Sequence, residues 1–271
     1  MKLNEGLGPH IKGVTAGKLL FGSADPLAWR RYEARVPFLL QQDHHTVLSS
    51  AAPPSYTDIP ELRRIDTTSG HLCSQKALLA LYLRLCATLP DALELAAADL
   101  LEVVSFKHSF MQWRPNLAHF TGECATRARP CRAAATSDGE VRRASRAALA
   151  ALRARGPAGL RDALKALSTI HGASAATAAL VCAFAAPQVA CFLCDELLSV
   201  RDPRGFVPRT GELSEDAACA LAEGCREKAS ELNWAEARAT FAGAQAPLPQ
   251  WTANSVAMAV WAAWQLGARA P

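Results

Sequence analysis

Apolar residues recur every three or four positions along most of this 271-residue chain, and segments that alternate apolar with polar residues are nearly absent. The first pattern is typical of α-helices with one buried face, and the second is typical of strands. Asp25 is expected to cap the first helix, with Pro26 in its first turn. Helical spacing is clearest in segments 25–42, 74–89, 91–106, 140–156, 159–170, 174–186, 214–232 and 253–266. The sequence therefore predicts an all-α fold, a multi-helix globule.

The domain organisation follows from the length of the chain and from its polar segments. Half of the residues are hydrophobic, which is enough to bury a substantial core. Segments 49–60, 126–139 and 201–211 are rich in residues that favour turns and are expected to connect helices. We expect residues 1–24 to be an N-terminal extension. Residues 25–271 are expected to form one domain, with two helical lobes around a cleft.

Hydropathy and cysteine usage limit the class of protein. No run of about eighteen apolar residues occurs, and the first two dozen residues lack the apolar centre of a secretory signal. We therefore expect no membrane span and an intracellular location, in the nucleus or an organelle. The nine cysteines lie mainly in apolar helical segments, which predicts reduced core residues. Cys191 and Cys194 form a CxxC pair without a second pair at zinc-finger spacing, so no metal site is expected.

Residues 160–186 contain two helical segments separated by a short break that includes Gly172. Glycine permits a sharp turn that a side chain would obstruct, and Ser174 can cap the helix that follows. The segment is therefore predicted to be a helix-hairpin-helix motif. An ordinary helical corner has the same features and remains an alternative.

The segment LSTIHGASAATA at 167–178 resembles the helix-hairpin-helix DNA glycosylase superfamily. Members carry an apolar residue, Pro-Gly-apolar-Gly, two variable positions and Thr-Ala, with an essential Asp beyond the second helix. The positions that match are Ile170, Gly172, Ala173, Thr177, Ala178 and Asp195. The chain also resembles an uncharacterised eukaryotic glycosylase-like group, through AWRRYEARV at 28–36, LEVVSFKHSFMQWRPNL at 101–117 and VACFLCDELL at 189–198.

The resemblance implies DNA as the partner, no required cofactor, and K⁺ or Na⁺ as a companion ion at the hairpin. Three positions depart from the superfamily pattern. His171 stands in place of Pro, and Ser174 stands in place of the second Gly. Ala176 stands where bifunctional members carry the lysine that forms a Schiff base. A glycosylase with this sequence would therefore be monofunctional, hydrolysing the N-glycosidic bond without cutting the strand.

A basic tract leads into the hairpin. Between residues 127 and 165, ten Lys and Arg residues stand against three acidic residues, a net +7 that exceeds the +4 of the whole chain. A helix N-terminus behind a glycine turn also offers N–H groups and the positive end of the helix dipole to a phosphate. A solvated helix face would carry similar charge. We predict a surface that binds DNA, with RNA as an alternative, formed by His171, Gly172, Ala173, Ser174, Ala175, Arg142, Arg143, Arg146 and Lys165.

Asp195 is the candidate catalytic residue. The resemblance implies that its carboxylate faces the sugar of an extruded nucleotide, where it stabilises oxocarbenium charge or orients water. An Asp at this place can also open the helix that follows, and the two roles are compatible. Phe110, Trp113 and Arg114 are predicted to line a pocket for the base, although their spacing also suits a core helix with a basic edge.

Two functions that involve nucleic acid remain open from the sequence, and a general helical scaffold without nucleic acid is a third alternative. The first is nucleic-acid binding with base excision repair by a monofunctional DNA glycosylase. The alternative is a catalytically silent relative that acts as a structural or interaction protein in a nucleoprotein assembly. P-loop, GxGxxG, HExxH and GxSxG motifs are absent, which argues against nucleotide hydrolysis, dinucleotide chemistry and common hydrolase mechanisms.

Overall fold

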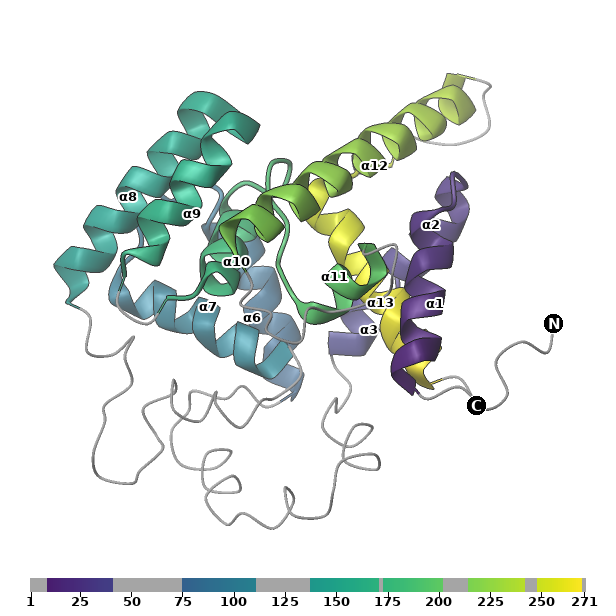
Figure 1. Ribbon diagram of the computed structural model, residues 1–271, viewed down its shortest axis with the longest axis horizontal. Coiled ribbons are helices and arrows are strands. Elements are labelled where there is room, and N and C mark those ends of the chain that lie inside the picture. Colours follow the sequence, from purple (N-terminus) through teal and green to yellow (C-terminus); the bar gives the residue numbers. More distant parts are fainter. Residues whose placement is uncertain are drawn as a thin grey trace, which may run out of the picture.

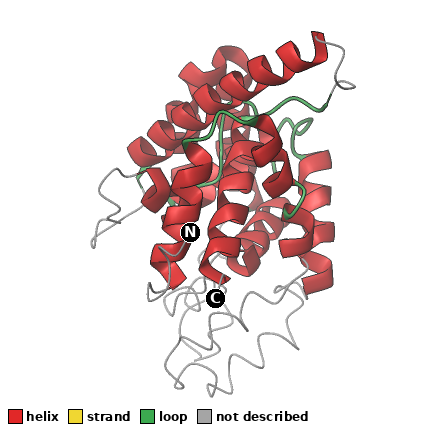
Figure 2. Cartoon of the chain, turned by 90° about the vertical axis from the view of Figure 1, so that its right-hand side faces the viewer, coloured by secondary structure: helices red, strands yellow, loops and turns green. Residues whose placement is uncertain are grey.

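The computed structural model describes residues 9–40, 75–110, 137–170, 173–201, 214–241 and 248–269. These residues form helices joined by turns and loops, with no strand among them (Figures 1 and 2). The predicted all-α fold is therefore confirmed. The helices are α1 (Pro9–Phe21), α2 (Pro26–Glu33), α3 (Val36–Leu40), α6 (Gln75–Thr88), α7 (Ala97–Phe110), α8 (Asp138–Arg155), the 3-10 turn η3 (Gly156–Gly159), α9 (Leu160–Ser168), α10 (Ala175–Ala185), α11 (Asp195–Arg201), α12 (Glu215–Phe241) and α13 (Ala253–Arg269).

Helix α10 lies at the centre of the molecule. Its residues from Ala176 to Phe184 are all buried, and it packs against α6, α7, α9, α12 and α13 (Figure 1). A helix that is apolar on every side is stable only inside a core. Its many alanines leave room for neighbouring backbones to approach. The helix that follows the candidate hairpin is thus held rigidly from several directions.

Helix α2 begins as the sequence predicts. Asp25 Oδ1 accepts a hydrogen bond of 3.0 Å from the N–H of Leu27, and a proline occupies the first turn. The expectation of one helix over 25–42 is wrong, because α2 ends at Glu33 and α3 begins three residues later. Pro37 has no N–H to donate to the Glu33 carbonyl, and its ring would collide with that carbonyl in a continuous helix.

The helix expected over 91–106 begins only at Ala97. Two carboxylates define this start. Asp99 Oδ2 accepts from the N–H of Ala96 at 2.8 Å, and Asp138 Oδ1 accepts from the N–H of Ala97 at 2.8 Å. These bonds satisfy backbone donors that have no partner within the helix. The residues before α7 are left to cross the face of α8.

The segment expected to be an N-terminal extension contains α1, which packs along α13 (Figure 1). Glycines allow this close approach. A Cβ on Gly13 would lie 2.8 Å from the ring of Trp264, and a Cβ on Gly17 would collide with Cγ2 of Val200 in α11. Trp264 is buried. Residues 9–21 are therefore part of the same core as the helices that follow.

Helix α12 is 27 residues long, and its C-terminal half projects beyond most of its neighbours (Figure 1). Arg30 of α2 anchors it. The Nε and Nη2 atoms of Arg30 each donate a hydrogen bond of 2.7 Å to the carboxylate of Glu236. The same guanidinium lies 4.2 Å from the centroid of the Trp251 ring.

None of the helices in the described part of the chain combines the length and the hydropathy that a membrane span requires.

Candidate nucleic-acid-binding site

The predicted hairpin corresponds to α9, a short connection and α10. The N–H of Ala173 donates to the carbonyl of Ile170 at 2.9 Å, which closes part of the connection. Ser174 caps α10 as predicted, because its Oγ accepts from the N–H of Thr177 at 3.3 Å. The predicted contacts His171 and Gly172 lie outside the described residues. Around them, Ala173 and Ala175 are half-buried and Ser174 is exposed.

Lys107 of α7 reaches the N-terminus of α10. Its Nζ donates to Oγ1 of Thr177 at 2.8 Å and to Oγ of Ser174 at 3.1 Å. An ammonium group therefore lies beside the first turn of the helix, where the helix dipole is positive. The sequence did not place Lys107 at the hairpin, because 67 positions separate it from Ser174 and only the packing of α7 on α10 brings them together.

The basic tract carries less free charge than its sequence indicates. Arg142 donates from Nε to Asp138 at 2.6 Å and from Nη1 to Glu94 at 2.7 Å. Arg146 donates from Nε to the other oxygen of Glu94 at 2.8 Å. Glu94 lies outside the tract, so a count within the tract could not include it.

These ion pairs shift the pKa values of their members in the expected directions. Hydrogen bonds from Arg142 and Arg146 lower the pKa of Glu94. Hydrogen bonds to Asp138 and Glu94 raise the pKa of Arg142. Both changes favour the charged forms, so Glu94 and Arg142 stay ionised over a wider range of pH.

Other cations of the tract differ in their surroundings. Arg155 pairs with Asp162, and Arg161 pairs with Asp216 of α12. Arg143 and Lys165 are exposed and form no ion pair within the described part of the chain. Of the predicted basic residues, these two offer the most available positive charge to a ligand.

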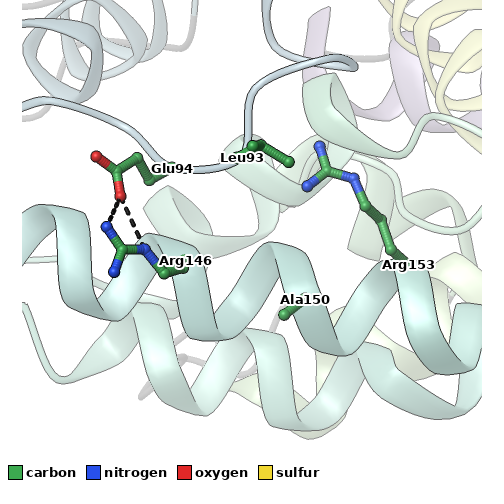
Figure 3. Close-up of a pocket in the computed structure, with 5 residues that line it drawn as sticks. All are labelled: Leu93, Glu94, Arg146, Ala150 and Arg153. Atoms are coloured by element: carbon green, nitrogen blue, oxygen red, sulfur yellow. Dashed lines mark hydrogen bonds and ion pairs between the residues drawn. The ribbon is translucent and has the colours of Figure 1, made fainter.

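A groove lies where the residues before α7 cross α8 (Figure 3). Its volume is about 540 Å³, and it is lined by Leu93, Glu94, Arg146, Ala150 and Arg153. Nε of Arg146 on α8 donates to the carboxylate of Glu94, which precedes α7 (Figure 3). Arg153 donates to the carbonyl of Ala92. None of the described residues that line the groove belongs to α10 or α11.

Asp195 is the first residue of α11, directly after the buried stretch from Cys191 to Cys194. This agrees with its predicted place at the start of a helix. Its side chain lies outside what the structure describes, as does the side chain of Phe110 at the end of α7. Trp113 and Arg114 also lie outside the described residues.

The aromatic residue nearest to that pocket in sequence, Phe106, belongs to the core. Its ring lies 5.3 Å from that of Phe184 and 5.7 Å from that of Tyr82, measured between centroids. Phe106 is buried, so it cannot stack on a base without a rearrangement of the core. Burial also raises the pKa of the Tyr82 hydroxyl, which therefore stays neutral.

The CxxC pair is part of the core as well. Cys191 and Cys194 are buried, and neither is in a disulfide bond. A hydrogen bond with Cys225 and burial together raise the pKa of Cys191. A buried thiol with a raised pKa is a poor nucleophile, because nucleophilic attack needs the thiolate.

No protein-family model, curated protein or solved structure matches this chain.

Proposed function

We propose that this chain is a nucleic-acid-binding protein that holds a backbone phosphate at the N-terminus of α10. The observation that carries the proposal is the position of Lys107, whose ammonium group lies beside the Ser174-capped first turn. A cation at the positive end of a helix dipole is unfavourable by itself. A phosphate oxygen in the same place would be attracted by both charges and by the first N–H groups of the helix.

The exposed cations around the hairpin support the same ligand. Lys165 lies in the last turn of α9, and Arg143 lies on α8, which packs against α9. Arg142 and Arg146 are paired with acids, but both side chains are more than a third exposed. Exposed ion pairs contribute about 0–1 kcal/mol, so a phosphate can replace the carboxylates at little cost. A polyanion would therefore bind across α8 and the hairpin.

The proposal includes the helix-hairpin-helix motif and the cleft that the sequence predicts. The six-residue link from Thr169 to Ser174, the serine cap and the packing of α9 on α10 support the motif. Backbone carbonyls of such a turn would hold K⁺ or Na⁺ as the resemblance implies. Because these contacts position a backbone and do not read bases, binding should show little sequence preference.

The binding experiment uses a fluorescent 20-base-pair duplex and the matching single strand, titrated with the full chain and followed by anisotropy. Lys107→Gln keeps a hydrogen-bonding group near Ser174 but removes the charge, so we expect weaker binding of both probes. Arg31→Gln is the matched control, because it removes one exposed positive charge from α2, on the opposite side of the molecule (Figure 1). Equal affinity of the two variants would contradict the site.

A more specific function, monofunctional base excision, is favoured by the start of α11 at Asp195. This is the place that the resemblance gives to the essential carboxylate. The chain would then act where DNA is found, in the nucleus or an organelle. Incubation with duplexes that carry uracil, alkylated, oxidised or mismatched bases, followed by alkali, should break the strand only after the alkali step. No cleavage on any lesion would favour the catalytically silent relative.

A further inference from the structure

An exposed tryptophan marks the projecting half of α12. The side chain of Trp234 is 65% exposed, whereas Trp29, Trp251, Trp261 and Trp264 are all buried. Its helix is anchored on the opposite side, where Leu232 is buried and Glu236 binds Arg30. Glu231 and Arg238 are exposed on the side of Trp234, and Figure 1 shows the C-terminal half of α12 at the edge of the molecule. Tryptophan is enriched among the residues that dominate the energy of protein interfaces.

The outer face of α12 has an ordered arrangement of charge. Helical spacing of three or four residues places on one face Glu223, Glu227, Glu231, Trp234 and Arg238. All five residues are exposed. The guanidinium carbon of Arg238 lies 5.1 Å from the centroid of the Trp234 ring. The face is thus acidic toward the N-terminus, aromatic near its end, and basic beyond the ring.

This order decides which partner the face fits. Three carboxylates on the same stripe would repel a phosphate backbone, so nucleic acid is a poor ligand for it. A second copy of the same helix is complementary when it runs in the opposite direction. A two-fold axis near Trp234 brings Glu231 of one copy opposite Arg238 of the other and places the two indole rings together. A parallel arrangement would bring like charges together instead.

The charges of this face are available for such an exchange. Lys228 donates to Glu231 at 2.5 Å. The Lys228 side chain is only 11% exposed, whereas Glu231 is 44% exposed, so the carboxylate remains accessible to a partner. Arg238 is held over the indole ring, which orients its guanidinium before a partner arrives. The partner's carboxylate would add to this contact without breaking it.

We propose that the chain forms a two-fold homodimer in which the C-terminal halves of α12 pack antiparallel, with Trp234 at the axis and Glu231 paired with Arg238 of the second copy. The interface is isologous, since the same face serves both copies. It lies on α12 and does not use α8, α9 or the start of α10. The dimer is therefore independent of the proposed nucleic-acid site.

Sedimentation equilibrium of the full chain over about 1–100 µM tests the dimer. Wild type should show a concentration-dependent shift from one to two chain masses. Trp234→Ala should weaken dimerisation by about tenfold or more, as expected for a central hot-spot residue. Leu19→Ala is the matched control, because Leu19 is an equally exposed apolar residue, 66% accessible, on α1. Its dissociation constant should equal that of wild type.

A charge exchange tests the direction of the helices. Arg238→Glu and Glu231→Arg each place like charges together and should weaken the dimer by about tenfold. The double variant restores opposite charges and should return to within about threefold of wild type. Far-ultraviolet circular dichroism verifies that each variant remains helical. A wild-type mass that stays at one chain, a dimer that survives Trp234→Ala, or a double variant weaker than both single variants would overturn the proposal.

Discussion

The ammonium of Lys107 donates a hydrogen bond of 2.8 Å to Oγ1 of Thr177, which joins α7 to the first turn of α10. Thr177 is buried, so its hydroxyl has little access to water. The contact therefore ties a charged group at the candidate phosphate site to the centre of the core. Lys107 is held near the helix N-terminus before any ligand binds, which lowers the entropy cost of binding a phosphate.

Salt dependence should report how many phosphates the site contacts. With about four phosphates neutralised, the slope of log Kobs against log salt should be near −3 to −4 for duplex DNA. The double variant Arg143→Gln, Lys165→Gln removes two exposed cations that form no ion pair in the described part of the chain. Its slope should be shallower by about 2. Affinity that does not change with salt would exclude the whole surface as the binding site.

The close contact of α1 with α11 predicts a matched pair of glycine substitutions. A Cβ on Gly17 would collide with Cγ2 of Val200, so Gly17→Ala should lower the free energy of unfolding by about 1–3 kcal/mol. A Cβ on Gly139 would meet nothing within 4 Å, so Gly139→Ala should raise it by up to about 1 kcal/mol. Urea denaturation measures both changes. Equal effects of the two variants would contradict the packing of α1.

Stability should fall in acid partly because Glu94 loses its ion pairs with Arg142 and Arg146. The pKa of Glu94 lies below its ordinary 4.5 because Arg142 and Arg146 donate to it. A carboxylate with a lowered folded pKa stabilises the protein above its unfolded pKa, and this contribution is lost as the pH falls through the folded value. The urea midpoint should therefore decline below about pH 4.5. The decline should be shallower in Glu94→Gln and unchanged in Glu223→Gln, which alters an exposed carboxylate that forms no ion pair among the described residues.

Local signals in the sequence predicted much of the fold. Asp25 and Ser174 cap helices where their positions indicate, and the apolar spacing of α10 and α13 predicts buried helices. Local signals also explain one failure, since Pro37 was present in the sequence and divides α2 from α3. The apolar spacing on both sides of Pro37 favoured one continuous helix over 25–42, although the proline indicated a break.

The candidate site was less predictable because its contacts are long-range. Lys107 reaches the hairpin from α7, and Glu94 reaches Arg142 across 48 positions. Neither contact follows from helical spacing or from a motif. The charge of a tract can be counted from the sequence, but its pairing with acids elsewhere requires the packing of α7 and α8.

The substitution Asp195→Asn separates catalysis from binding. Asparagine keeps the size of the side chain but removes the charge that would stabilise an oxocarbenium-like transition state. The rate of base release should therefore fall by about 10²-fold or more, with DNA affinity within about twofold of wild type. Glu196→Gln is the matched control, because it removes the other charge of the acidic pair at the next position of α11 and should leave the rate unchanged. Single-turnover release of the base, followed by alkaline cleavage, measures both variants. Base release that persists in Asp195→Asn would remove Asp195 from the mechanism, whereas equal losses in the two variants would assign the acidic pair a structural role at the start of α11.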